Sequence, residues 1–249
     1  MSADVSQAAV RDPAVDSALD KWRARWPEWP LAEPFVAPLH RERAIAWFAL
    51  RDELTHAAWS GADPRPGEAK LAWWAEELHG WSKGLRRHPL GNVLQREPAA
   101  WNALAASLPA LLASRDRAGT ADEAFLLLEP FAEGVAGVAA ALFGGGSPAP
   151  ARSVVVGLLG ERVLAGGDAA APLASVAQAG EGGAPLAAAR AWARDLLERW
   201  PPPHEGAVAG RLHAAMVRER LSRFAAGAPA DKPLPAWRAL LTAWQAARR

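Results

Sequence analysis

The chain has 249 residues, of which 51% are hydrophobic and 22% are charged, and its formal net charge at neutral pH is +1. This apolar fraction excludes a mainly disordered chain, and a net charge near zero gives no reason to expect a nucleic acid as a partner. Cys and Tyr do not occur, which rules out disulfides, thiolate metal sites and catalysis by a cysteine or a tyrosine.

The first twenty residues lack the basic segment and the apolar core of a signal peptide. The most apolar stretch, 135–143, ends in three glycines and is shorter than the roughly 18 residues that a membrane helix needs. We therefore expect no transmembrane segment and a cytoplasmic location. A peripheral association with a membrane stays open.

Helix-forming residues dominate, since alanine alone makes up about a quarter of the chain. β-branched residues are few, and no segment alternates as a half-buried strand would. The sequence predicts an all-α bundle of about ten helices joined by short loops rich in glycine and proline. In chain order the expected helices are 15–26, 41–59, 66–83, 98–115, 122–143, 149–164, 172–179, 185–200, 206–226 and 235–248.

These helices are expected to form a single domain over residues 1–249. Within it, residues 1–38 are read as an N-terminal helix followed by a proline-rich connection. Residues 144–183 are rich in glycine, and we expect them to be the weakest part of the ordered core.

Asp12, Asp16 and Asp20 follow one another at intervals of four residues, which places three carboxylates on one face of a helix. Like charges at this spacing repel unless a cation neutralises them, and magnesium bound to a diphosphate is one such cation. The alternative is that Asp12 caps the helix and the other two are solvated near its N-terminus.

A polar stripe is expected on helix 41–59, where Asp52, His56 and Trp59 are spaced by four and three residues. Glu53 and two basic residues, Arg43 and Arg51, accompany it. Facing inward, these groups could bind a metal ion or a diphosphate. The alternative is a solvated face with an Asp52–His56 pair.

The next expected helix combines two adjacent tryptophans, Trp73 and Trp74, with two adjacent glutamates, Glu76 and Glu77. Adjacent helical residues point about 100° apart, so the two rings define a broad aromatic wall. Core packing of both rings is the alternative. Cationic residues that include Arg87 follow this helix.

Taken in order, the segments 43–54, 71–78 and 88–90 resemble the squalene/phytoene synthase family. The family has an Arg-Ala helix, a W-W-x-x-E-L helix and a downstream His-Pro pair, and this chain reads Trp73-Trp74-Ala-Glu-Glu77-Leu between the other two elements. Segment 131–138 is similar to the family's V-A-G helix. The resemblance is weaker over 207–249 and poor over 144–206.

The resemblance implies an all-α isoprenoid-synthase bundle. Family members that are enzymes join two prenyl diphosphates head to head. Two aspartate-rich motifs on facing helices hold Mg²⁺, which stabilises the departing diphosphate, and an aromatic-lined cavity shields the carbocation. By this likeness the substrate-binding residues would be Arg43, Arg51, Trp73, Trp74 and Arg87.

Both aspartate motifs are missing at the matching positions. Alignment on Arg43 places the first aspartate pair on His56 and Ala57, and the region of the second motif offers only Glu161 and Asp168. The chain therefore looks like the diverged branch of the family, which includes respiratory complex I assembly factors. We expect no metal site and a non-catalytic protein that binds an isoprenoid-like lipid or a protein partner.

An active enzyme is the alternative. It would be a prenyl transferase that needs Mg²⁺ as cofactor, takes a prenyl diphosphate as substrate and uses an atypical acidic site. The catalytic candidates are then Asp52, Glu53, His56, Glu76, Glu77 and Glu161.

Overall fold

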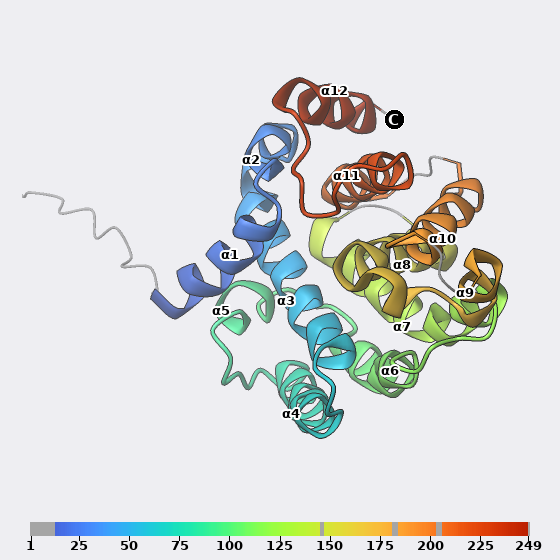
Figure 1. The fold of residues 1–249 in the computed structure, drawn as a ribbon. Coiled ribbons are helices and arrows are strands. Elements are labelled where there is room, and N and C mark those ends of the chain that lie inside the picture. Colours follow the sequence, from blue (N-terminus) through green and yellow to red (C-terminus); the bar gives the residue numbers. More distant parts are fainter. Residues whose placement is uncertain (1–12, 145–146, 181–183, 203–205, 249) are drawn as a thin grey trace, which may run out of the picture.

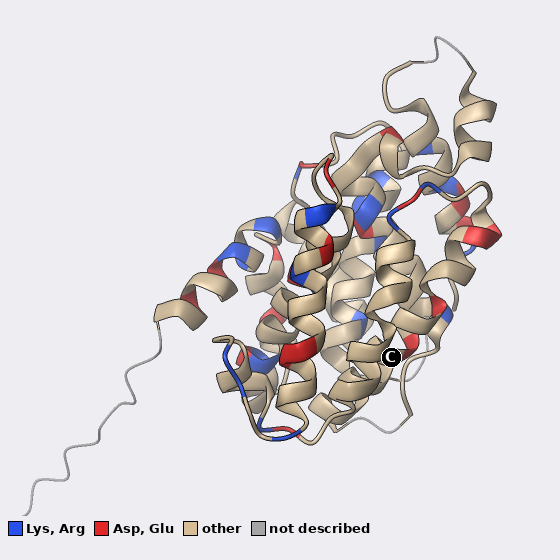
Figure 2. Ribbon diagram, turned by 90° about the horizontal axis from the view of Figure 1, so that it is seen from below, with Lys and Arg blue, Asp and Glu red and all other residues tan. Residues whose placement is uncertain are grey.

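In the computed structural model the protein is entirely helical over the residues that it describes, which are 13–144, 147–180, 184–202 and 206–248. No strand occurs in these ranges, so the predicted all-α class is confirmed. Basic and acidic residues are interspersed along the helices rather than segregated by sign (Figure 2).

Twelve α-helices and three short 3-10 turns make up the described chain (Figure 1). The α-helices are α1 (Pro13–Arg25), α2 (Trp29–Ala32), α3 (Arg41–Trp59), α4 (Arg65–Trp81), α5 (Gly91–Leu94), α6 (Trp101–Ala113), α7 (Ala121–Phe143), α8 (Ala151–Gly166), α9 (Leu173–Ala179), α10 (Ala187–Glu198), α11 (Val208–Ala225) and α12 (Ala236–Ala247). The 3-10 turns are η1 (Glu33–Phe35), η2 (Pro38–His40) and η3 (Gly167–Ala170).

All ten helices expected from the sequence are present, with ends that differ by at most three residues. The two additional helices, α2 and α5, are single turns within proline-containing connections. The largest shift is at α6, which begins at Trp101 rather than at Pro98. A turn in which the Ala99 N–H donates to the Glu97 carbonyl precedes it, and Ala100 is not helical.

Helix α3 packs against α1, α4, α5 and α6. Helices α8 and α11 lie on the side of α3 away from α4 and α5 (Figure 1). Seven consecutive residues, 44–50, are buried, so this helix has no solvent-facing stripe along these two turns. A helix that is apolar on every side belongs in the interior of a fold. Helix α3 therefore fixes the polar groups of its C-terminal half against the surrounding helices.

Within the glycine-rich segment 144–183, helix α8 is part of the core, whereas α9 has no buried residue. Seven of its residues are buried, including Gly157 and Gly160. A side chain at Gly160 would meet Val217 of α11 at 3.0 Å, so the glycine allows the two helices to pack closely. Residues 145–146 and 181–183 of this segment lie outside the described residues, so the expectation for them is not addressed.

Helix α7 is the one described helix that is long and apolar enough to cross a membrane by length and composition. It packs between α6 and α8, and Glu129 and Glu133 are exposed on its surface. A buried core helix of a bundle passes the same test of length and composition. The expected absence of a transmembrane segment and the expected cytoplasmic location stay predictions.

Candidate functional site

A polar pocket of about 420 Å³ opens where the C-terminal half of α3 faces α8. Asp52 and His56 of α3 line it together with Glu161 and Arg162 of α8. Arg25, at the end of α1, and Arg115, after α6, complete its charged lining. We refer to this space as the polar pocket.

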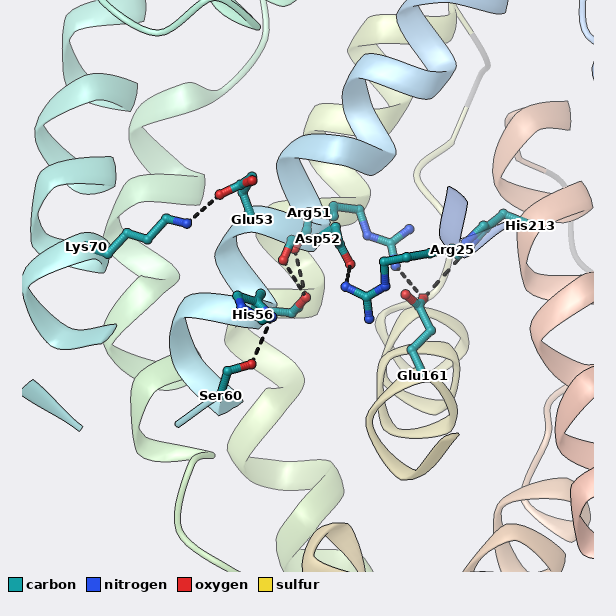
Figure 3. Close-up of polar contacts among 10 residues, drawn as sticks. Arg25, Arg51, Asp52, Glu53, His56, Ser60, Lys70, Glu161 and His213 are labelled. Atoms are coloured by element: carbon teal, nitrogen blue, oxygen red, sulfur yellow. Dashed lines mark hydrogen bonds and ion pairs between the residues drawn. The ribbon is translucent and has the colours of Figure 1, made fainter. Parts of the chain in front are cut away.

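Both acidic residues of the polar pocket form ion pairs with arginines (Figure 3). Arg25 Nη1 lies 2.5 Å from Asp52 Oδ1, and Arg51 Nη2 lies 2.9 Å from Glu161 Oε1. The expected Asp52–His56 pair is not formed, because Asp52 turns towards Arg25 and His56 Nδ1 is hydrogen-bonded to Ser60 Oγ at 2.8 Å. The carboxylates are thus neutralised within the protein.

His213 of α11 approaches the same site from the core side. Its ring is stacked on Phe48 with centroids 4.5 Å apart, and its Nδ1 lies 3.8 Å from Glu161 Oε1. Burial, together with the charges of Arg51 and Arg220, lowers the pKa of His213 well below its usual value. The imidazole is therefore neutral at pH 7. Burial also raises the pKa of Glu161, although the charge of Arg51 opposes this effect.

The buried neutral state of His213 predicts a loss of stability in acid. An unfolded histidine titrates near pH 6.5, whereas His213 in the folded protein resists protonation, so the unfolded state binds more protons below that pH. The stabilisation is present above about pH 6.5 and is lost as the pH falls, by at most about 1.4 kcal/mol per pH unit for one group.

Urea unfolding at pH 5, 6 and 7 measures this dependence. His213→Leu is expected to flatten it, while the matched substitution Met216→Leu, at a buried position of the same helix, is expected to keep it. An unchanged slope in His213→Leu would contradict the assignment of the acid sensitivity to this ring.

Two arginines of the polar pocket are held by backbone carbonyls. Arg115 donates to the carbonyls of Ala58, Ser60 and Gly61, while Arg162 donates to those of Ser114 and Arg115. In the described chain neither guanidinium lies within ion-pair distance of a carboxylate. Burial, and then the charges of Arg115 and Arg117, lower the pKa of Arg162 to about 10. An anion in the pocket would offset the unfavourable free energy of keeping the buried Arg162 guanidinium charged.

A narrow apolar cavity of about 80 Å³ lies between α3, α7, α8 and α11. Trp47 and Phe48 of α3 line it, together with alanine and valine side chains of α7. Arg51 also lines this cavity, and its partner Glu161 lines the polar pocket. The Arg51–Glu161 ion pair therefore connects the lining of the apolar cavity with that of the polar pocket.

Glu77 of α4 is part of a second cluster on the other side of α3. Its buried carboxylate accepts hydrogen bonds from Trp81 Nε1 at 2.8 Å and from the backbone N–H groups of Arg87 and His88 at 2.7 and 2.8 Å. Burial acts to raise the pKa of Glu77, but these hydrogen bonds outweigh it and the pKa is lowered. Glu77 thus holds the loop after α4 against the helix.

The two adjacent tryptophans pack in this same cluster and form no wall of either cavity. Trp74 is fully buried against Trp81 and His88, and Trp73 lies beneath the guanidinium of Arg87 at 5.3 Å. Trp74 is thus a core residue, as the alternative interpretation predicts for both rings. Trp73 is partly exposed at the edge of the cluster.

The remaining predicted residues are dispersed. Glu53 points to α4 and pairs with Lys70 at 2.5 Å, Glu76 is exposed beside Arg87, and Arg43 bonds to Glu97 and to the Leu142 carbonyl (Figure 3 shows the first of these contacts). Of the six catalytic candidates, the polar pocket brings together only Asp52, His56 and Glu161. Of the five predicted substrate-binding residues, Arg51 alone adjoins this pocket, through its ion pair with Glu161.

A magnesium ion does not fit these donors. Mg²⁺ takes oxygen ligands in octahedral geometry, and the two carboxylates of the polar pocket already bind guanidinium groups. Over the described ranges, no group of three or more His, Cys, Asp or Glu side chains is placed to hold a metal ion. Of the N-terminal aspartates, Asp20 pairs with Arg23 at 3.0 Å, and Asp12 lies outside the described residues.

The sequence analysis does not identify three residues that line the polar pocket, Arg25, Arg115 and Arg162. It also does not identify His213, which lies beside Glu161. Each comes from an element other than α3, and nothing local in the sequence marks them as members of one site. The one usable signal was the large excess of arginine over lysine, since arginine is the cation that proteins favour in buried ion pairs.

Comparison with models of protein families finds no match, and comparison with curated protein sequences finds none either.

Proposed function

We propose that this protein is a non-catalytic helical bundle of the squalene/phytoene synthase type, which binds an isoprenoid-like lipid with an anionic head group without magnesium. The observation that carries this proposal is the pairing of Asp52 with Arg25 and of Glu161 with Arg51. Catalytic members of that family would need free carboxylates to bind metal ions. In this chain the carboxylates of Asp52 and Glu161 are neutralised by arginines of the protein itself.

The cations of the polar pocket support an anionic ligand. Arg115 and Arg162 have no carboxylate partner there, and the exposed His56 lines the same space. Guanidinium groups suit the oxygens of a phosphate or a carboxylate, because they form paired, charge-assisted hydrogen bonds.

The apolar cavity supports a hydrocarbon contact but not condensation of two long chains. Ligand pockets of proteins usually enclose about 300–1,000 Å³, whereas this cavity has about 80 Å³. The large aromatic side chains of Trp22, Trp29 and Phe48 fill the neighbouring core. A cavity this small favours binding of part of one lipid.

Binding and turnover can be separated in one experiment. The full chain is titrated with farnesyl diphosphate and with geranylgeranyl diphosphate, with and without Mg²⁺, while diphosphate release is recorded. We expect binding in the absence of Mg²⁺ and no release. Arg162→Gln is expected to weaken binding about tenfold, as loss of a charge-assisted hydrogen bond would. The control is Arg152→Gln, on the same helix but away from the pocket.

Diphosphate release that Asp52→Ala abolishes would overturn the proposal in favour of the active prenyl transferase. Absence of binding to either diphosphate would overturn the lipid ligand and leave a protein partner as the function of the bundle. Equal weakening by Arg162→Gln and Arg152→Gln would show that the polar pocket is not the binding site.

A further inference from the structure

The C-terminal helix α12 exposes a row of large apolar side chains to solvent. Trp237, Leu240, Leu241 and Trp244 have exposed fractions of 63, 50, 45 and 41%. Their spacing of three, one and three residues places all four on one face of the helix. We call these four residues the α12 stripe.

The opposite face of α12 attaches the helix to the bundle. Ala239 and Ala243 are fully buried, and the helix packs on α11 and α2. In Figure 1 it lies at the outer edge of the molecule, beyond both of these helices. The α12 stripe therefore faces away from the core, and no described part of the chain covers it.

The four exposed apolar side chains of the α12 stripe lie next to one another on the surface. Among the described residues, four other large apolar side chains are more than half exposed, but they lie singly in separate parts of the fold: Leu39, Leu85, Leu126 and Leu173. Single exposed leucines are ordinary on soluble proteins, whereas a contiguous exposed patch marks an interaction surface. We therefore interpret the α12 stripe as an interaction surface.

Arginines lie beside both tryptophans of the stripe. The guanidinium of Arg238 is 5.0 Å from the centre of the Trp237 ring, and that of Arg248 is 3.7 Å from the centre of the Trp244 ring. The last 18 residues of the sequence contain four basic residues and no acidic one. Arg238 also pairs with Glu219 of α11 at 2.6 Å, so the positive charge beside the stripe comes mainly from Arg248.

We propose that α12 docks on the surface of a lipid bilayer that contains anionic lipids. Tryptophan is favoured at the boundary between head groups and acyl chains, because its ring is apolar and its N–H is polar. The two leucines between the tryptophans would enter the acyl region, while Arg248 beside Trp244 would reach phosphate groups. This arrangement of charge and apolar surface favours a membrane over a second protein surface.

The proposal does not rest on the lipid-binding pocket. Helix α12 lines neither the polar pocket nor the apolar cavity. A protein that fails to bind a prenyl diphosphate can still bind vesicles through α12, and the two results are measured separately.

Vesicle flotation of the full chain tests the docking directly. One set of vesicles consists of phosphatidylcholine alone, and in the other about a third of the lipid is phosphatidylserine. We expect the protein to float with the anionic vesicles and to be released as salt is raised. Trp237→Ser combined with Trp244→Ser is expected to lower the partition onto these vesicles about tenfold or more.

Two further variants sharpen the result. Arg248→Gln is expected to weaken binding to the anionic vesicles about fivefold and to leave the weak binding to neutral ones unchanged. Leu85→Ser combined with Leu126→Ser removes equally exposed apolar residues elsewhere and is expected to bind as the unchanged protein does. Circular dichroism verifies that each variant is folded.

Failure of the unchanged protein to float with anionic vesicles would overturn the proposal, as would equal flotation of the double tryptophan variant. A concentration-dependent dimer that the tryptophan substitutions abolish, in a protein without vesicle binding, would also overturn it. The stripe would then be covered by a second copy of the chain.

Discussion

Replacing Glu77 by alanine is expected to lower the free energy of unfolding by about 3–5 kcal/mol. The carboxylate is 1% exposed and accepts hydrogen bonds from four donors: the side chains of Trp81 and Arg87 and the backbone N–H groups of Arg87 and His88. Its removal leaves buried donors without acceptors and frees the loop after α4. Urea unfolding followed by circular dichroism measures the loss.

The adjacent residue supplies the control. Glu76 is 73% exposed and reaches Arg87 only at 3.6 Å, so Glu76→Ala is expected to change the free energy of unfolding by less than about 1 kcal/mol. Glu77→Gln keeps the shape of the side chain, and its loss in the free energy of unfolding is expected to lie between those of Glu77→Ala and Glu76→Ala. A Glu77→Ala variant that loses ligand binding while retaining full stability would contradict the structural role and favour a catalytic one.

Arg220→Ala is expected to destabilise the protein by a similar amount, about 3–5 kcal/mol. Arg220 of α11 binds both carboxylate oxygens of Glu28 at 2.5 Å, and the Glu28 side chain is 1% exposed. The guanidinium also lies 4.1 Å from the centre of the Trp26 ring. Without it, a charged carboxylate would remain buried between the N-terminal helices and α11.

A partly solvated ion pair that joins α11 to α12 is the matched comparison. Glu219 pairs with Arg238 of α12 at 2.6 Å, with both side chains partly solvated, and Arg238→Ala is expected to cost less than about 1 kcal/mol. Replacing Arg220 by Met and Glu28 by Leu together should recover most of the stability, because no buried charge is then left alone. Equal losses in Arg220→Ala and Arg238→Ala would contradict this account.

The helices were predictable from the sequence because their signals are local. Alanine and leucine favour helices over whole segments, and proline and glycine mark the connections, so α3 was predicted with its observed ends. The single-turn helices α2 and α5 were not predictable, since four residues carry no periodicity. The burial of α8 was also missed, because glycine content says nothing of how closely a helix packs.

The candidate site was predicted only in part. Asp52, His56 and Glu161 were chosen for their residue types and do meet in the polar pocket. Their partners come from distant segments: Arg25 is 27 residues from Asp52, and Arg51 is 110 residues from Glu161. An i, i+4 rule pairs Asp52 with His56, but the stronger attraction of a guanidinium from another helix prevails.

The complete burial of residues 44–50 on α3 has a consequence for how this sequence can change over time. Close-packed interiors tolerate substitutions that preserve volume and penalise those that add or remove atoms. Trp47 and Phe48 stand among small alanines there, and a change at any of these positions needs a compensating change on a facing helix. Distant relatives of this chain should therefore be easiest to recognise by the order of large and small residues along this segment.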